Sequence, residues 1–162
     1  MNKSKKILVA GIGNILKSDD GLGSSVINWL RRLKPPQNVE LIELGTSGLS
    51  ILSYVKGYDK VIFIDVIIRG GKPGSIYILK PEDVADLAKA VSPQNLHSMS
   101  IHEVNLEKTI AIGRALGEMP HDVVIIGCEP EDVSTSRIGL TDKVREAIPK
   151  IIQLIFKELS IS

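Results

Sequence analysis

The chain has 162 residues, enough for one domain with a substantial core and too few for two ordinary domains. Hydrophobic residues make up 43% and charged residues 24%, as in a soluble globular protein. The 20 Lys and Arg residues nearly balance the 19 Asp and Glu residues, so charge gives no reason to expect nucleic acid or a membrane surface as the main partner. Because no 18-residue apolar run and no leader-like segment occurs, we expect one cytoplasmic domain over residues 1–162.

The first part of the chain alternates short apolar runs with helical patterns. A run that is apolar throughout is typical of a strand buried on both faces, and apolar residues at helical spacing mark a helix face that packs on a sheet. Pro35 and Pro36 end the first helical pattern. We expect strands at 5–12, 39–44 and 60–66, a helix at 21–34, and a short helix through Leu49, Leu52 and Val55.

The second part of the chain predicts two more strands and three helices. A strand at 75–79 follows the previous strand too closely for a crossover helix, so we expect it to be antiparallel or at an edge of the sheet. The other elements are helices at 81–90, 104–116 and 140–159, a strand at 123–126, and an irregular polar segment at 91–102. This order predicts an α/β fold: a three-layer α/β/α sandwich whose five-stranded, mostly parallel mixed sheet carries helices on both faces.

The corner after the first strand is a candidate ligand site, because α/β folds bind ligands where strands end. Gly11 and Gly13 give the start of a dinucleotide fingerprint, but Leu16 stands where its third glycine belongs. Asp19 and Asp20 follow and would repel a pyrophosphate. These observations weigh against a nucleotide site at this corner.

Asp19 and Asp20 are neighbours, so their side chains point in different directions on a helix or turn. An Asp just before a helix can accept a hydrogen bond from a first-turn amide. We therefore expect Asp19 to cap the first helix and Asp20 to be the functional carboxylate.

A second acid and two histidines complete a candidate metal site. Asp65 ends the apolar strand at 60–66, and a carboxylate there is costly to bury unless it is paired, metal-bound or at the solvent-facing tip. Either His97 or His102 would meet it if the polar segment folds over the sheet edge, whereas His121 lies in a turn setting and is interpreted as a surface residue. Two carboxylates and one imidazole suit Ni²⁺ or Zn²⁺.

Cys128 is the single cysteine and ends an apolar run. We interpret it as a small buried hydrophobic residue. No Ser/His/Asp or Cys/His arrangement for nucleophilic catalysis stands out in the sequence.

The segment from Gly11 to Gly23 resembles the N-terminal signature of the hydrogenase maturation proteases, Gly-x-Gly-Asn followed by Asp-Asp/Glu-Gly/Ala-x-Gly. Three further segments resemble that family's later motifs: Gly45-Thr46-x-Gly48, Ile64-Asp65-Val66 and Ile138-Gly139-Leu140-Thr141. The resemblance covers almost the whole chain. By it the sequence is identified as a member of the endopeptidases that trim the large-subunit precursor of [NiFe] hydrogenases.

The resemblance implies a catalytic and metal-contacting set of two acids, Asp20 and Asp65, and one histidine. The family's histidine is followed by x-x-x-Leu and by a helix with a Gly-Glu-x-Pro-like end. His102 fits this register without a gap, and His97, which would need an insertion, is the alternative. The resemblance assigns substrate binding to Gly45, Thr46 and Gly48.

The implied function is an aspartyl-type, cytoplasmic endopeptidase that activates a hydrogenase by removing the C-terminal extension of its large-subunit precursor after nickel insertion. The nickel is the recognition feature and arrives with the precursor, so no permanent cofactor is expected. The precursor is the expected partner, and nickel-insertion chaperones are further candidates. Two other hypotheses stay open: a metallohydrolase with its own divalent metal, and a nucleotide- or metal-binding regulatory module.

Overall fold

The computed structural model describes residues 4–80 and 105–161. Its strands are β1 (Ile7–Ile12), β2 (Val39–Gly45), β3 (Lys60–Val66), β4 (Ile76–Leu79) and β5 (Asp122–Cys128). Its α-helices are α1 (Leu22–Arg32), α2 (Ile51–Val55), α5 (Leu106–Ala115) and α6 (Asp142–Ser160), and its 3-10 helices are η1 (Ser18–Gly21) and η2 (Gly48–Ser50). A helix suited to crossing a bilayer is not found in this described part of the chain.

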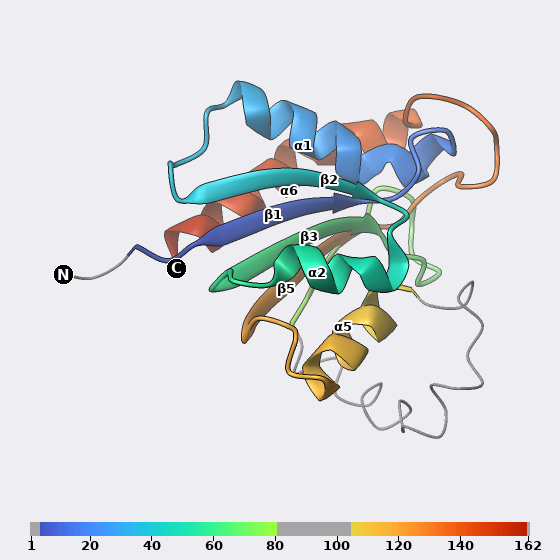
Figure 1. Cartoon of the computed structure of the whole chain (residues 1–162). Coiled ribbons are helices and arrows are strands. Elements are labelled where there is room, and N and C mark those ends of the chain that lie inside the picture. Colours follow the sequence, from blue (N-terminus) through green and yellow to red (C-terminus); the bar gives the residue numbers. More distant parts are fainter. Residues whose placement is uncertain (1–3, 81–104, 162) are drawn as a thin grey trace, which may run out of the picture.

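The strands form one sheet in the order β2-β1-β3-β5-β4 (Figure 1). The first four strands of this order are parallel, and β4 at the edge is antiparallel to β5. In the central pair, Gly11 of β1 is in register with Ile64 of β3. The carboxyl ends of β1 and β3 therefore lie side by side, which brings the segments that follow Gly11 and Ile64 together.

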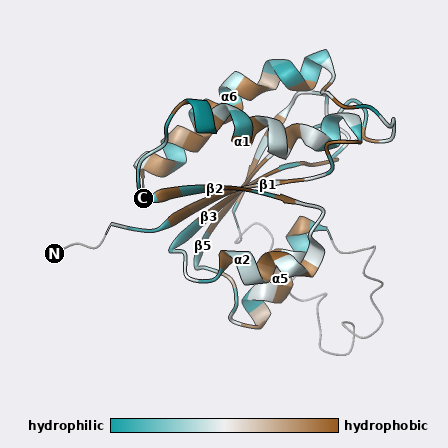
Figure 2. Ribbon diagram, turned by 45° about the horizontal axis from the view of Figure 1, so that its top comes forward, coloured by the Kyte–Doolittle hydropathy of each residue, from teal (hydrophilic) through white to brown (hydrophobic). Residues whose placement is uncertain are grey.

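Helices cover both faces of the sheet. Helices α1 and α6 lie on one face, and α2 and α5 lie on the other (Figures 1 and 2). Neighbouring residues of one strand serve opposite cores: Val9 packs toward α1 and α6, whereas Leu8 packs toward α2 and α5. This two-sided burial is the reason that the parallel strands are apolar throughout rather than alternating.

The predicted α/β sandwich and the antiparallel edge strand are confirmed. The first helix differs from the prediction, because the chain enters it through the 3-10 helix η1 and the α-helix begins at Leu22. The last helix begins at Asp142, not at residue 140. The helix expected at 81–90 and the polar segment at 91–102 lie outside the described residues.

Candidate active site

Glycines at the corner between β1 and α1 allow two backbone segments to touch. Gly13 has a φ of +113°, and a Cβ on it would lie 2.0 Å from the carbonyl oxygen of Asp20. A Cβ on Gly23 would lie 2.4 Å from the carbonyl oxygen of Ile12. Only glycine fits at such distances. The glycine motif thus serves backbone packing, and this packing places Asp20 against the end of β1.

The carboxylate of Asp20 is held by the turn that leaves β1. Its Oδ2 accepts the backbone N–H of Asn14 at 2.8 Å, and the Asn14 side chain in turn accepts the N–H of Leu16 at 2.9 Å. A phosphate bound at a strand–helix corner uses free backbone amides of this kind. Because a carboxylate occupies the Asn14 amide, the corner is poorly suited to a nucleotide.

Asp65 lies at the end of β3, next to this corner. Its Oδ1 accepts the backbone N–H of Val66 at 2.8 Å. Burial and, second, the charge of Asp20 raise the pKa of Asp65 to about 7, and the Val66 amide opposes this rise. Within the described part of the chain, neither Asp20 nor Asp65 forms an ion pair. The two predicted acids therefore meet at one site, where their negative charges repel each other.

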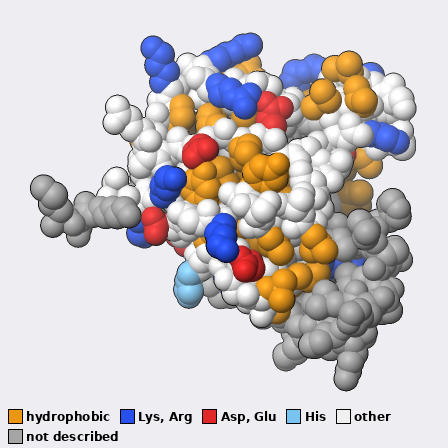
Figure 3. Space-filling view, viewed as in Figure 1, with side chains coloured by type: hydrophobic (Ala, Val, Ile, Leu, Met, Phe, Trp, Pro, Cys, Tyr) orange, Lys and Arg blue, Asp and Glu red, His pale blue; other side chains and the backbone are white. Residues whose placement is uncertain are grey.

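Two carboxylates without a paired cation are suited to bind a divalent metal. Residues 4–80 and 105–161 do not by themselves bring three His, Cys, Asp or Glu side chains together as a metal site. His102, the preferred third ligand, and His97, its alternative, lie outside the described residues. The described histidine, His121, is at the surface, where the prediction placed it (Figure 3).

Asp19 does not cap the first helix, so that prediction is wrong. Its side chain is fully buried and turns away from α1, whose N-cap residue is Gly21, toward the loop before α6. Oδ2 accepts the N–H groups of Glu131 at 2.8 Å and Asp132 at 2.9 Å, and Oδ1 accepts that of Thr141 at 2.7 Å. The physical reason is η1, which continues into α1 and leaves Asp19 inside a helical stretch rather than before it.

The predicted substrate-binding turn borders the same corner. The N–H of Gly13 donates to the carbonyl oxygen of Gly45 at 2.9 Å, which joins the ends of β1 and β2. Gly45 and Thr46 line a cleft of about 370 Å³ together with Asn14. Gly48 begins η2, and its φ of +54° suits glycine. The turn thus lies beside the segment that holds Asp20.

Glu129 is a buried acid whose role the sequence reasoning missed. It is 4% exposed and directly follows β5. Its carboxylate accepts the N–H groups of Arg69 at 2.8 Å and Gly70 at 3.1 Å and the hydroxyl of Tyr77 at 2.8 Å. These hydrogen bonds, with the Arg69 amide first, lower the pKa of Glu129. Glu129 thus holds the loop that follows Asp65. Its position directly after a buried strand is the sequence signal that could have revealed this role.

Cys128 is buried, as predicted for a small hydrophobic residue. Burial, followed by the charges of Asp19 and Glu129, raises the pKa of its thiol to about 11. A thiol with so high a pKa stays protonated at neutral pH and is a poor nucleophile. The raised pKa therefore argues against Cys128 as a nucleophile.

Comparison with known proteins gives a consistent assignment. Residues 25–158 match the HycI family model, described as hydrogenase maturation protease. The chain is 33% identical over 160 residues to the hydrogenase expression/formation protein HupD of Bradyrhizobium diazoefficiens, covering 98% of this chain and 80% of HupD.

Solved structures agree with this assignment. The hydrogenase maturating endopeptidase HybD of E. coli has a TM-score of 0.75 at 29% identity, over 96% of this chain and 92% of HybD. A hydrogenase 2 maturation peptidase from Thaumarchaeota archaeon SCGC_AB-539-E09 has a TM-score of 0.68 at 32% identity, over 98% of this chain and 100% of the peptidase.

The chain belongs to the hydrogenase maturation protease family and is a hydrogenase maturation endopeptidase. The family match begins at residue 25, beyond the segment from Gly11 to Gly23. The match and the resemblance of that segment to the family signature therefore depend on different residues.

Proposed function

We propose that this endopeptidase removes the C-terminal extension of a [NiFe] hydrogenase large-subunit precursor after nickel insertion, and that it recognises the nickel carried by the precursor. The observation that supports this most directly is the pair Asp20 and Asp65. The charge of Asp20 contributes to a pKa of about 7 at Asp65, and no ion pair within the described residues offsets either charge. Such a pair favours a cation supplied from outside. The proposed enzyme works in the cytoplasm as one domain over residues 1–162.

In this proposal Asp20, Asp65 and His102 contact the nickel of the precursor, with His97 as the alternative histidine. Three oxygen and nitrogen donors suit a nickel ion that the precursor already holds in part. The nickel supplies Lewis-acid chemistry that polarises a carbonyl group or a water molecule. Asp20 or Asp65 would accept the proton of that water, because a carboxylate at the reacting centre can act as a general base.

The turn that contains Gly45, Thr46 and Gly48 is the proposed binding place for the substrate chain. Gly45 and Thr46 line a cleft of about 370 Å³ that also reaches Asn14, the residue whose amide holds Asp20. A peptide segment in this cleft would pass close to the carboxylate pair. The proposal therefore assigns peptide positioning to the turn and the metal contact to the acids.

The test is processing of a purified large-subunit precursor, with and without nickel, followed by mass spectrometry of the new C-terminus. Asp20→Asn, Asp65→Asn and His102→Ala are each expected to slow processing by about 10²- to 10⁴-fold, because each removes a group that acts at the reacting centre. Asp142→Asn is the matched control: its carboxylate is 86% exposed and lies on α6, and this variant should process normally.

Each alternative has its own outcome. Equal processing of nickel-free precursor would overturn nickel recognition, and stoichiometric zinc in protein purified without added metal would favour a metallohydrolase with its own metal. A thermal shift with nucleotides would favour the regulatory module. A loss of processing in His97→Ala, with normal processing in His102→Ala, would exchange the roles of the two histidines.

A further inference from the structure

We propose that five exposed residues beside the corner between β1 and α1 form a docking surface for the folded body of the large-subunit precursor. We call this surface the docking platform, and its residues are Ile15, Leu16, Lys17, Arg137 and Ile138. This inference rests on the proposed function, because it names the surface on which the precursor lies while its C-terminal extension reaches Asp20. It commits to a partner surface that is apolar and carries acidic side chains.

The platform joins two segments that are far apart in the sequence. The backbone N–H of Arg137 donates to the carbonyl oxygen of Leu16 at 3.1 Å, and the N–H of Ser18 donates to that of Arg137 at 2.8 Å. Lys17 and Arg137 thus pair as in a parallel sheet. Figure 1 shows the two segments side by side, as the turn after β1 (blue) and the loop before α6 (orange). Leu16 and Ile138, which flank this bridge, therefore belong to one surface.

The platform exposes three large aliphatic side chains. Ile15 is 49% exposed, Leu16 is 56% exposed and Ile138 is 75% exposed. Single apolar side chains are common on protein surfaces, but a group of them beside a functional site is typical of a surface that binds another protein. Covering these three side chains removes apolar area from water, and this burial favours binding.

The buried Asp19 holds the loop that carries Arg137 and Ile138. Its carboxylate accepts the N–H groups of Glu131 and Asp132 near the start of the loop and that of Thr141 at its end. The N–H of Asp19 also donates to the carbonyl oxygen of Asp132 at 2.9 Å. A loop that is held at both ends loses little conformational entropy when a partner binds. Asp19 thus gives the platform a fixed shape before the precursor arrives.

The platform carries two positive charges that no acid in the described residues compensates. The cleft beside Ile138 has a volume of about 520 Å³ and is lined by two acids and three cations. Two ion pairs compensate four of these charges: Lys143 with Glu131 at 2.7 Å, and Arg145 with Asp142 at 2.6 Å. The third cation, Arg137, donates to the neutral hydroxyl of Ser18 at 3.3 Å. Neither Arg137 nor the neighbouring Lys17 forms an ion pair within residues 4–80 and 105–161, so acidic side chains of a partner would complement them.

The platform begins at the turn that holds the carboxylate of Asp20. The N–H of Leu16 donates to the side chain of Asn14, whose own N–H donates to Asp20. A protein whose C-terminal extension reaches Asp20 places its folded body over the residues that surround this corner. The position of the platform therefore favours the precursor as its occupant over an unrelated protein.

Ile138 gives a way to test the platform without disturbing the fold. It is 75% exposed and belongs to no helix or strand of the described chain, so a substitution there should leave folding intact. Ile138→Asp places a carboxylate where the acidic partner surface is expected, whereas Ile138→Leu keeps the aliphatic contact. Ile161→Asp is the matched control, because Ile161 is 66% exposed and lies near the C-terminus, which Figure 1 shows far from the platform.

The experiment is single-turnover cleavage of the nickel-loaded precursor with the enzyme in excess, which separates binding from the chemical step. Ile138→Asp should raise the half-saturating enzyme concentration by about tenfold or more, while the maximal rate changes by less than about twofold. Ile138→Leu and Ile161→Asp should keep both values. Arg137→Glu should also weaken binding at low salt, and it should reduce the dependence of binding on ionic strength.

The outcomes separate the platform from the function on which it rests. Normal half-saturation in both Ile138→Asp and Arg137→Glu would overturn the platform while the proposed function stands. A lower maximal rate at unchanged half-saturation would also overturn it, because these residues would then act in the chemical step and not in docking. Failure of the unmodified enzyme to cleave a nickel-loaded precursor would overturn the proposed function itself.

Discussion

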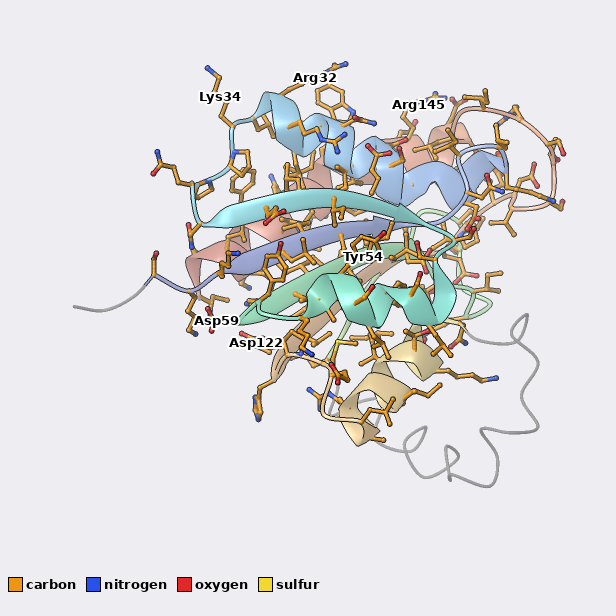
Figure 4. The ribbon with its side chains drawn as sticks, in the orientation of Figure 1. Arg32, Lys34, Tyr54, Asp59, Asp122 and Arg145 are labelled. Atoms are coloured by element: carbon orange, nitrogen blue, oxygen red, sulfur yellow. The ribbon has the colours of Figure 1, made fainter. Side chains whose placement is uncertain are left out.

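Charges at the two ends of the parallel strands are compensated to different degrees. At the end where the strands begin, Lys60 is 2% exposed, and its ammonium lies 3.0 Å from the carboxylate of Glu158 and 3.7 Å from that of Asp122. Figure 4 shows Asp122 at this end, near Asp59. At the end where the strands stop, Asp20 and Asp65 repel each other, and within the described residues no ion pair compensates their charges.

The difference separates a structural role, at Lys60, from the functional role that we propose for Asp20 and Asp65. A buried charge is tolerated when a partner compensates it, and Lys60 finds its partners within the chain. Carboxylates that repel each other near the surface cost stability in the isolated protein, and such groups gather at functional sites. Removing a charge should therefore lower the stability where the strands begin and reduce the repulsion where they end.

The largest stability effect is expected at Lys60. Lys60→Met removes the ammonium that lies 3.0 Å from the carboxylate of Glu158, which is 11% exposed, and also removes the hydrogen bond to the Glu158 carbonyl. Loss of one partner of a buried pair costs about 3–5 kcal/mol. The free energy of unfolding in urea should fall by this amount, while the folded fraction processes precursor at the normal rate.

The matched control removes both charges. In Lys60→Met combined with Glu158→Met, apolar side chains replace the pair, and such replacements are often close to neutral. The double variant should therefore recover more than half of the lost free energy of unfolding. A double variant as unstable as the single one would show that packing of the Lys60 stem, not its charge, holds this edge.

The next largest effect separates the neighbouring acids Asp19 and Asp20. Asp19→Ala leaves the partly buried amides of Glu131, Asp132 and Thr141 without their acceptor, which should cost about 3 kcal/mol of unfolding free energy. Asp20→Ala removes one amide contact and also relieves repulsion with Asp65, so its cost should stay below about 1 kcal/mol. Urea unfolding of both variants checks this order, and equal losses would contradict the division of roles.

The parts of the fold and site that could be predicted are those with a local signal. Strands that are apolar on both faces predicted the parallel sheet, and the short connection to β4 predicted its antiparallel direction. Asp65 stood out because an acid ended an apolar run, and parallel strands place such ends at one edge. These inferences need only neighbouring residues and the rules of strand connection.

The parts that could not be predicted depend on partners far away in the sequence. Asp19 looks like a helix cap locally, but its partner Thr141 is 122 residues away. Lys60 and Glu158 are 98 residues apart, and nothing near either residue in the sequence indicates the pair. Periodicity gives the face on which a side chain lies, whereas long-range packing decides which amide or charge it meets.

The smallest effect is a pH dependence that comes from Asp65. Its pKa is about 7 in the folded protein and about 4 in an unfolded chain, so the folded state binds more protons between these values. Stability is therefore fully present below pH 4 and falls as the pH rises through 7. Relative to Asp65→Asn, the metal-free protein should lose on the order of 2 kcal/mol of unfolding free energy between pH 4 and pH 8. Asp142→Asn, which changes an exposed acid, should keep the original slope. An equal slope in Asp65→Asn would mean that burial and the charge of Asp20 do not raise the pKa of Asp65 in solution.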